Sequence, residues 1–184
     1  MSLSLLPNAL TLFRMISVGP IVYWLYTGAY RAAFILAVLA GISDLLDGFL
    51  ARRYGWVTHF GGVLDPLTDK LLLVSTTVML AWLGFLPWWL VILIVGRDLV
   101  IIGGAFYFHH RVTRITQSEP TRLSKINTFL QILLIVSVMM GLAFQGTVQP
   151  WMGGLIYLVA ASTLASGIQY VVIWSLKARQ VRSG

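Results

Sequence analysis

Six long apolar runs, joined by short turns, make up most of the chain and constrain its fold more than any other feature. Of the 184 residues, 58% are hydrophobic and only 10% are charged. A soluble domain carries roughly 25% charged residues, so this chain has too few to cover its surface in water. Each run has about the 20 residues that an α-helix needs to cross a bilayer. The runs span residues 9–27, 32–53, 60–85, 87–109, 123–144 and 151–177.

These runs predict an all-α integral membrane protein, a bundle of six transmembrane helices in a single domain, residues 1–184. Helices are favoured over strands because lipid offers no partner for unpaired backbone groups. The alternating pattern of a membrane barrel is missing from the sequence. Leu3, Leu5 and Leu6 precede the first run and predict a short N-terminal interfacial segment.

The distribution of Lys and Arg predicts the orientation, because cytoplasmic loops carry an excess of these residues. The side with only Arg31 is predicted to be external, and both termini are predicted to be cytoplasmic. We expect a multi-pass protein of a bacterial inner membrane. The formal charge of +7 does not indicate nucleic-acid binding, because the basic residues form no stripe. The basic residues of the cytoplasmic side are Arg52, Arg53, Arg111, Arg114, Arg122, Lys125, Lys177, Arg179 and Arg182.

Four of the six acidic residues lie between positions 44 and 69. Asp44 and Asp47, three residues apart, share one face of the second predicted helix. Asp65 and Asp69, four residues apart, share one face of the third. A short turn at residues 54–59 folds the second helix back against the third. We therefore expect the two acidic faces to meet near the cytoplasmic membrane boundary.

Carboxylates crowded in this way repel one another and cannot all stay ionised unaided. Protonation, Arg or Lys counter-ions, or bound cations would relieve the repulsion, and Arg52, Arg53 and Lys70 are the basic residues close in sequence. The chain has no cysteine, so thiolate metal sites are excluded. Oxygen ligands alone suit Mg²⁺ or Mn²⁺. Two such ions a few ångström apart would suit displacement at a phosphoryl group.

The acidic segment carries a pattern of defined residues and spacings. It reads D-x-x-D-G-x-x-A-R over residues 44–52, then eight residues, then G-x-x-x-D-x-x-x-D over residues 61–69. This pattern resembles that of the CDP-alcohol phosphotransferase (CDP-alcohol phosphatidyltransferase) family. The opening Pro7-Asn8-x-x-Thr11-x-x-Arg14 is also similar to the N-terminal segment of that family.

The resemblance implies roles for these residues. Asp44 and Asp65 would bridge two cations, Asp47 would complete the first site and Asp69 the second. Asp69 would also be the catalytic base that takes the proton of the acceptor hydroxyl. The donor would be CDP-diacylglycerol, and the family tendency to dimerise makes a homodimer an expected assembly. The residues implied to hold the cytidine diphosphate part are Pro7, Asn8, Thr11, Gly48, Ala51, Arg52 and Thr58.

The resemblance indicates the acceptor alcohol less clearly than the donor. Arg97-Asp98 inside the fourth run and the segment 120–131 look most like the cardiolipin synthases of the family, which accept phosphatidylglycerol. Phosphatidylglycerophosphate synthases, which use glycerol 3-phosphate, are the alternative. Arg97, Arg122 and Lys125 are the predicted acceptor-binding residues. For Arg97 the competing interpretation is an internal pair with Asp98 or Asp69, and for Lys125 it is a side chain that extends to the membrane interface.

Two functions of other classes are also compatible with acids in a membrane. A divalent-cation transporter would use them as an ion path, but its acids should be distributed through the membrane depth. Here they cluster at one end. A membrane prenyltransferase also uses aspartate pairs with Mg²⁺, but would need more helices than 184 residues supply.

Overall fold

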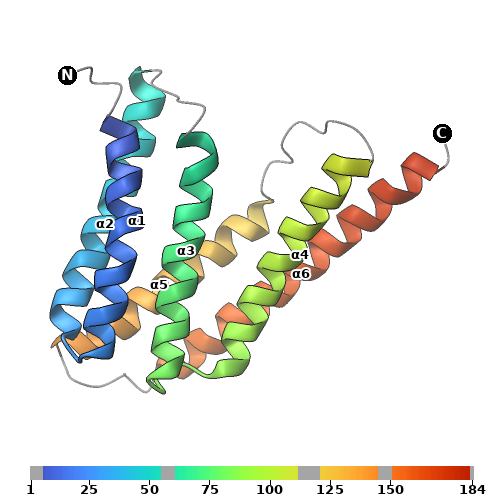
Figure 1. Cartoon of the computed structure of the whole chain (residues 1–184). Coiled ribbons are helices and arrows are strands. Elements are labelled where there is room, and N and C mark those ends of the chain that lie inside the picture. Colours follow the sequence, from blue (N-terminus) through green and yellow to red (C-terminus); the bar gives the residue numbers. More distant parts are fainter. Residues whose placement is uncertain (1–5, 55–60, 112–120, 145–150, 183–184) are drawn as a thin grey trace. The chain divides into compact units, whose positions relative to one another are not determined.

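The computed structural model describes the backbone of residues 6–54, 61–111, 121–144 and 151–182, and the side chains of residues 10–46, 67–104, 121–144 and 151–175. All regular structure in these ranges is α-helical (Figure 1). The helices are α1 (Leu6–Tyr26), α2 (Tyr30–Tyr54), α3 (Gly61–Trp82), α4 (Trp88–Arg111), α5 (Arg122–Phe144) and α6 (Met152–Arg182). The all-helical prediction is confirmed.

Several helix ends differ from the prediction by a few residues, and two of them have a clear local reason. The third run was expected to continue to residue 85, but α3 ends at Trp82, and Gly84 adopts a φ of 82°. The amide of Phe85 then donates to the carbonyl of Leu80 at 2.9 Å, which caps the helix end. The last helix continues beyond the apolar run to Arg182, because Lys, Ala, Arg and Gln are good helix formers even where no apolar face requires them.

The chain forms two compact units. The first comprises Met1–Leu86 and Ile135–Gln149, and in it α1 packs against both α2 and α3 (Figure 1). The second comprises Pro87–Leu134 and Pro150–Gly184, and in it α4 packs along α6.

The helices bury polar side chains and expose large apolar ones. Ile16, Ile92 and Tyr157 are 63%, 69% and 70% exposed, whereas Arg14 and Asn127 are 1% and 0% exposed. Such a surface suits lipid, since large exposed apolar patches are rare on soluble monomers. Among the described residues, Arg122–Phe144 and Met152–Ser175 are long and apolar enough to cross a membrane, and Leu10–Tyr26 is a shorter apolar helix. These features agree with a helical membrane protein, while the six spans and the side of the termini stay predictions.

Candidate active site

An arginine of α1 lies between two aspartates of the acidic pattern. Arg14 is 1% exposed. Its Nη2 donates to Asp44 Oδ1 of α2 at 2.7 Å, and its Nη1 donates to Asp69 Oδ1 of α3. Because one guanidinium reaches both side chains, the two carboxylates converge although they come from different helices.

The charges of this group do not balance. Arg14 contributes one positive charge against the two negative charges of Asp44 and Asp69. Each of these carboxylate side chains is 41% exposed, so each has an open side that Arg14 does not cover. Among the described contacts, one guanidinium thus serves two carboxylates, and the exposed part of each carboxylate is accessible to a further cation.

A divalent cation fits what the structure shows of this site. Carboxylate oxygens are the ligands that Mg²⁺ and Mn²⁺ prefer, and Asp44 and Asp69 already present theirs close together. Among the described side chains, no three His, Asp or Glu residues gather closely enough to hold a metal ion. Asp47, one turn after Asp44 in α2, and Asp65, one turn before Asp69 in α3, have side chains outside the described ranges. The complete ligand set thus stays a prediction.

Most of the residues predicted to bind the nucleotide also lie outside the described side chains. Thr58 is not described, and the helices α1 and α2 contain the others. Thr11 is described and is buried one turn before Arg14 on α1. The residues in helices whose side chains are not described are Pro7, Asn8, Gly48, Ala51 and Arg52.

The sequence reasoning missed Arg14 as the counter-ion. Arg52, Arg53 and Lys70 are close to the acidic segment in the sequence, whereas Arg14 is 55 positions from Asp69. A signal was present, because Arg14 is the sole charged residue in the run 9–27. Charges inside apolar segments usually face the bundle interior and pair there. Arg97 and Asp98 lie inside an apolar run in the same way, and the same rule singles out Arg14.

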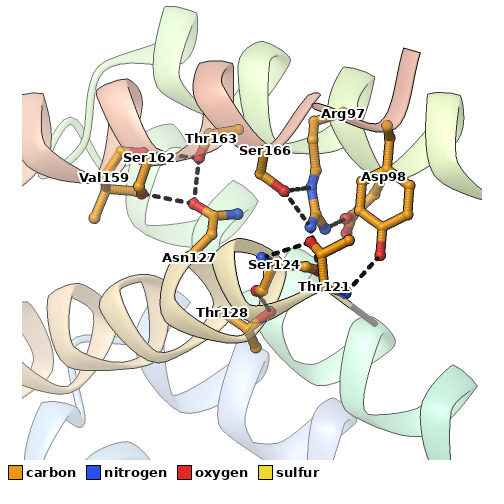
Figure 2. Close-up of polar contacts among 11 residues, drawn as sticks. Arg97, Asp98, Thr121, Ser124, Asn127, Thr128, Val159, Ser162, Thr163 and Ser166 are labelled. Carbon is orange, nitrogen blue, oxygen red and sulfur yellow. Dashed lines mark hydrogen bonds and ion pairs between the residues drawn. The ribbon is translucent and has the colours of Figure 1, made fainter. Parts of the chain in front are cut away.

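A second polar cluster lies in the other compact unit, around Arg97 of α4 (Figure 2). The Arg97 guanidinium donates to Asp98 at 2.7 Å, to Ser124 Oγ of α5 at 2.5 Å and to Ser166 Oγ of α6 at 2.8 Å. It also lies 5.7 Å from the ring centroid of Tyr170, within the range of a cation–π contact. The structure thus contains the Arg97–Asp98 pair, and Arg97 connects three helices.

The other two predicted acceptor-binding residues occupy the first turn of α5. Thr121 caps this helix, because its Oγ1 accepts a hydrogen bond from the amide of Ser124 at 3.2 Å. Arg122 and Lys125 are both exposed and three residues apart. They are therefore accessible to an anionic group, while Arg97 is buried at 8% exposure.

Known proteins share this sequence over nearly its whole length. The sequence model of the CDP-alcohol phosphatidyltransferase family matches residues 4–174. The chain is 35% identical over 182 residues to a probable cardiolipin synthase (CMP-forming) of Drosophila melanogaster, covering 91% of this chain and 56% of that protein. It is 35% identical over 200 residues to the chloroplastic CDP-diacylglycerol–glycerol-3-phosphate 3-phosphatidyltransferase 1 of Oryza sativa subsp. japonica, covering 96% of this chain and 58% of that protein.

A bacterial relative is matched over more of its own length. The chain is 31% identical over 171 residues to a CDP-diacylglycerol–glycerol-3-phosphate 3-phosphatidyltransferase of Rickettsia typhi, covering 90% of this chain and 94% of that protein. By contrast, the chain spans little more than half the length of the fly and rice proteins. The family match extends over α1 to α5 and most of α6, and it includes the aspartates that meet Arg14. The chain therefore belongs to the CDP-alcohol phosphatidyltransferase family.

Proposed function

We propose that this protein is a membrane phosphatidyltransferase that moves the phosphatidyl group of CDP-diacylglycerol to an alcohol and releases CMP. The observation that carries the proposal is the convergence of Asp44 and Asp69 on Arg14. It places the candidate catalytic base, Asp69, close to Asp44, a candidate metal ligand. The sequence of the chain also matches that of the family. The whole chain, residues 1–184, forms one functional domain in this proposal.

The reaction is a displacement at phosphorus. The acceptor hydroxyl oxygen forms a bond to the phosphorus that carries diacylglycerol, and the bond from that phosphorus to the CMP oxygen breaks. Asp69 takes the hydroxyl proton, since a carboxylate within hydrogen-bond reach can act as a general base. Arg14 holds the Asp69 carboxylate in place. Two divalent cations held by Asp44, Asp47, Asp65 and Asp69 would supply charge stabilisation of the phosphates.

The remaining site residues complete the proposal. Gly48, Ala51, Arg52 and Thr58 bind the cytidine diphosphate part of the donor, with Pro7, Asn8 and Thr11 beside it. Arg97, Arg122 and Lys125 serve the acceptor phosphate, and the exposure of Arg122 and Lys125 supports this for those two. The distribution of basic residues supports an active site on the cytoplasmic side of a bacterial inner membrane, and a homodimer is the expected assembly.

Phosphatidylglycerol is the first proposed acceptor, which makes the enzyme a cardiolipin synthase. The sequence of residues 120–131 and the Arg97-Asp98 pair support this choice. Glycerol 3-phosphate is the second candidate, and the names of the rice and Rickettsia relatives favour it.

One incubation tests both the transferase reaction and the identity of the acceptor alcohol. Purified protein is supplied with CDP-diacylglycerol, Mg²⁺ and either phosphatidylglycerol or glycerol 3-phosphate, and the lipid products and CMP are measured. Cardiolipin or phosphatidylglycerophosphate identifies the acceptor. Protein that is folded but releases no CMP with either alcohol would refute the transferase.

A further inference from the structure

An open groove of about 470 Å³ lies between α1 and α3, two helices that pack against each other in the first unit (Figure 1). Val22 and Tyr26 line it from α1. The α3 residues that line it recur every three or four positions, so they form one stripe along that helix. This stripe consists of Leu71, Val74, Ser75, Val78, Met79 and Trp82.

The groove is separate from the carboxylate that contacts Arg14. Asp69 lies two residues before Leu71, and residues two apart on a helix do not face the same side. From Leu71 the stripe continues away from Asp69 to Trp82, the last residue of α3. A ligand in the groove is therefore not a reactant of the proposed transfer, and its binding does not depend on the proposed function.

The walls of the groove are apolar. Between Leu71 and the aromatic end at Tyr26 and Trp82, the described lining carries a single polar group, the Ser75 hydroxyl. This hydroxyl already donates to the carbonyl of Leu71. A polar ligand would therefore gain little there. An empty groove would forfeit dispersion contacts along its whole lining, so an apolar group should fill it.

The length of the groove matches the depth of one lipid leaflet. From Leu71 to Trp82, α3 rises about 16 Å at about 1.5 Å per residue, and half of the hydrocarbon core of a bilayer is about 15 Å thick. Tyr26 and Trp82 end their helices and are 66% and 68% exposed. Tyr and Trp are enriched where the hydrocarbon meets the head groups. The aromatic end therefore marks the head-group level, and the groove extends from there towards the bilayer centre.

The side chains around the groove favour a lipid chain over a helix as its occupant. Membrane helices approach one another closely where small residues line their interface. Of the described lining residues only Ser75 is small, whereas Tyr26, Leu71 and Trp82 are large and exposed. These three side chains would hold the backbone of another helix away from the floor of the groove, but a flexible chain of methylene groups can lie between them.

We propose that the groove between α1 and α3 binds one acyl chain of a membrane phospholipid from the leaflet at the Trp82 end. The head group of this lipid lies at the level of Tyr26 and Trp82, and its chain contacts both helices at once. The bound chain thereby stabilises the packing of α1 against α3. Binding depends on the length of the chain more than on the head group, because only the chain enters the groove.

The test fills the groove with protein side chains. Val78→Phe places an aromatic ring in it. Ser75→Leu fills it less, and the hydroxyl that it removes bonds only to carbonyls of its own helix in the described part of the chain. Val136→Phe is the matched control, because Val136 is an exposed α5 residue of the same unit that does not line the groove.

Thermal midpoints are measured in detergent alone and in mixed micelles with dioleoyl phosphatidylcholine, which is neither the donor nor a proposed acceptor. The lipid should raise the midpoints of the wild type and Val136→Phe by about 3 °C or more. Dioctanoyl phosphatidylcholine should raise them less, because its short chains fill only part of the groove. Val78→Phe and Ser75→Leu should lose about half of the rise or more, and native mass spectrometry should find less phospholipid retained on them than on the wild type.

Three results would overturn the proposal: a wild type that the long-chain lipid does not stabilise, filled variants that keep the full rise, or an equal rise with both lipids. If Val78→Phe does not fold, Ser75→Leu decides by the same measurements. Light scattering tests the other occupant. A wild-type dimer that becomes a monomer in the filled variants would show that a second copy of the chain occupies the groove, which also overturns the proposal.

Discussion

Arg14 and Asp69 are 55 positions apart in the sequence, yet the guanidinium of Arg14 donates a hydrogen bond to the Asp69 carboxylate. The same guanidinium holds Asp44 at 2.7 Å. Arg14 is almost fully buried, whereas both carboxylates are partly exposed. The arginine thus contacts both carboxylates from a buried position, while part of each carboxylate stays accessible.

Arg14→Gln should destabilise the protein, and divalent cations should partly reverse the effect. Loss of charged hydrogen bonds of this kind costs about 2 kcal/mol, and the two carboxylates would lose the counter-ion that they share. Mg²⁺ restores positive charge there, so the loss of thermal midpoint should be larger in chelator than in Mg²⁺. Arg31→Gln is the control, because Arg31 donates to the carbonyl of Ala143 and contacts no carboxylate in the described part of the chain. An equal response of both variants to Mg²⁺ would contradict the prediction.

Asp69→Asn should abolish turnover and leave the fold intact. The amide oxygen of Asn can still accept the hydrogen bond from Arg14, but it cannot take the proton of the acceptor hydroxyl. General-base catalysis contributes about 10² to 10⁴ in rate, and the loss should be at least of that order. CMP release in detergent is the measurement, with the thermal midpoint as the check on folding. A variant that releases CMP at the wild-type rate would show that Asp69 is not the base.

Chelation with EDTA should stop CMP release, and Mg²⁺ or Mn²⁺ should restore it. Carboxylate oxygens are the ligands that these ions prefer, and Asp44 and Asp69 present theirs close together. Monovalent salt at matched ionic strength is the control, because it screens charge but does not bridge carboxylates and phosphates. Full activity in EDTA, or full rescue by KCl, would refute the role of the metal.

The apolar runs were enough to predict the helices, because each run has the length and composition of a helix in lipid. The acidic pattern likewise predicted that the second helix would fold against the third, with their acidic faces together. In the described part of the chain Asp44 and Asp69 do converge, but through Arg14 of α1, which packs against both helices, and no packing of α2 against α3 is found. The position of α1 beside them could not be derived from spacing, since only tertiary packing brings Arg14 to Asp69. The same holds for Ser166 and Tyr170, which are ordinary α6 residues in the sequence and become partners of Arg97 only when α6 packs along α4.

Gly104→Ala should destabilise the protein more than Gly103→Ala. A Cβ atom at Gly104 would lie 2.8 Å from Nε1 and 3.0 Å from Cε2 of the Trp174 indole, whereas a Cβ at Gly103 meets nothing within 4 Å. The rigid indole must shift, and overpacking of this kind costs about 1–3 kcal/mol. Gly103→Ala should instead be neutral or stabilising by up to about 1 kcal/mol, because Ala is the better helix former. Thermal unfolding of both variants in the same detergent decides this, and equal midpoints would contradict it.

Arg97→Lys should destabilise the second unit although the charge is kept. The planar guanidinium reaches Asp98, Ser124 and Ser166 at once, whereas a single ammonium group cannot satisfy all three in this geometry. The cation–π contact with Tyr170 would weaken as well. We expect a loss of about 2–3 kcal/mol, since breaking a buried charged network leaves polar groups unpaired. The thermal midpoint measures it, with Arg122→Lys as the control, because Arg122 is exposed in the first turn of α5. A variant as stable as this control would show that Arg97 does not hold α4, α5 and α6 together.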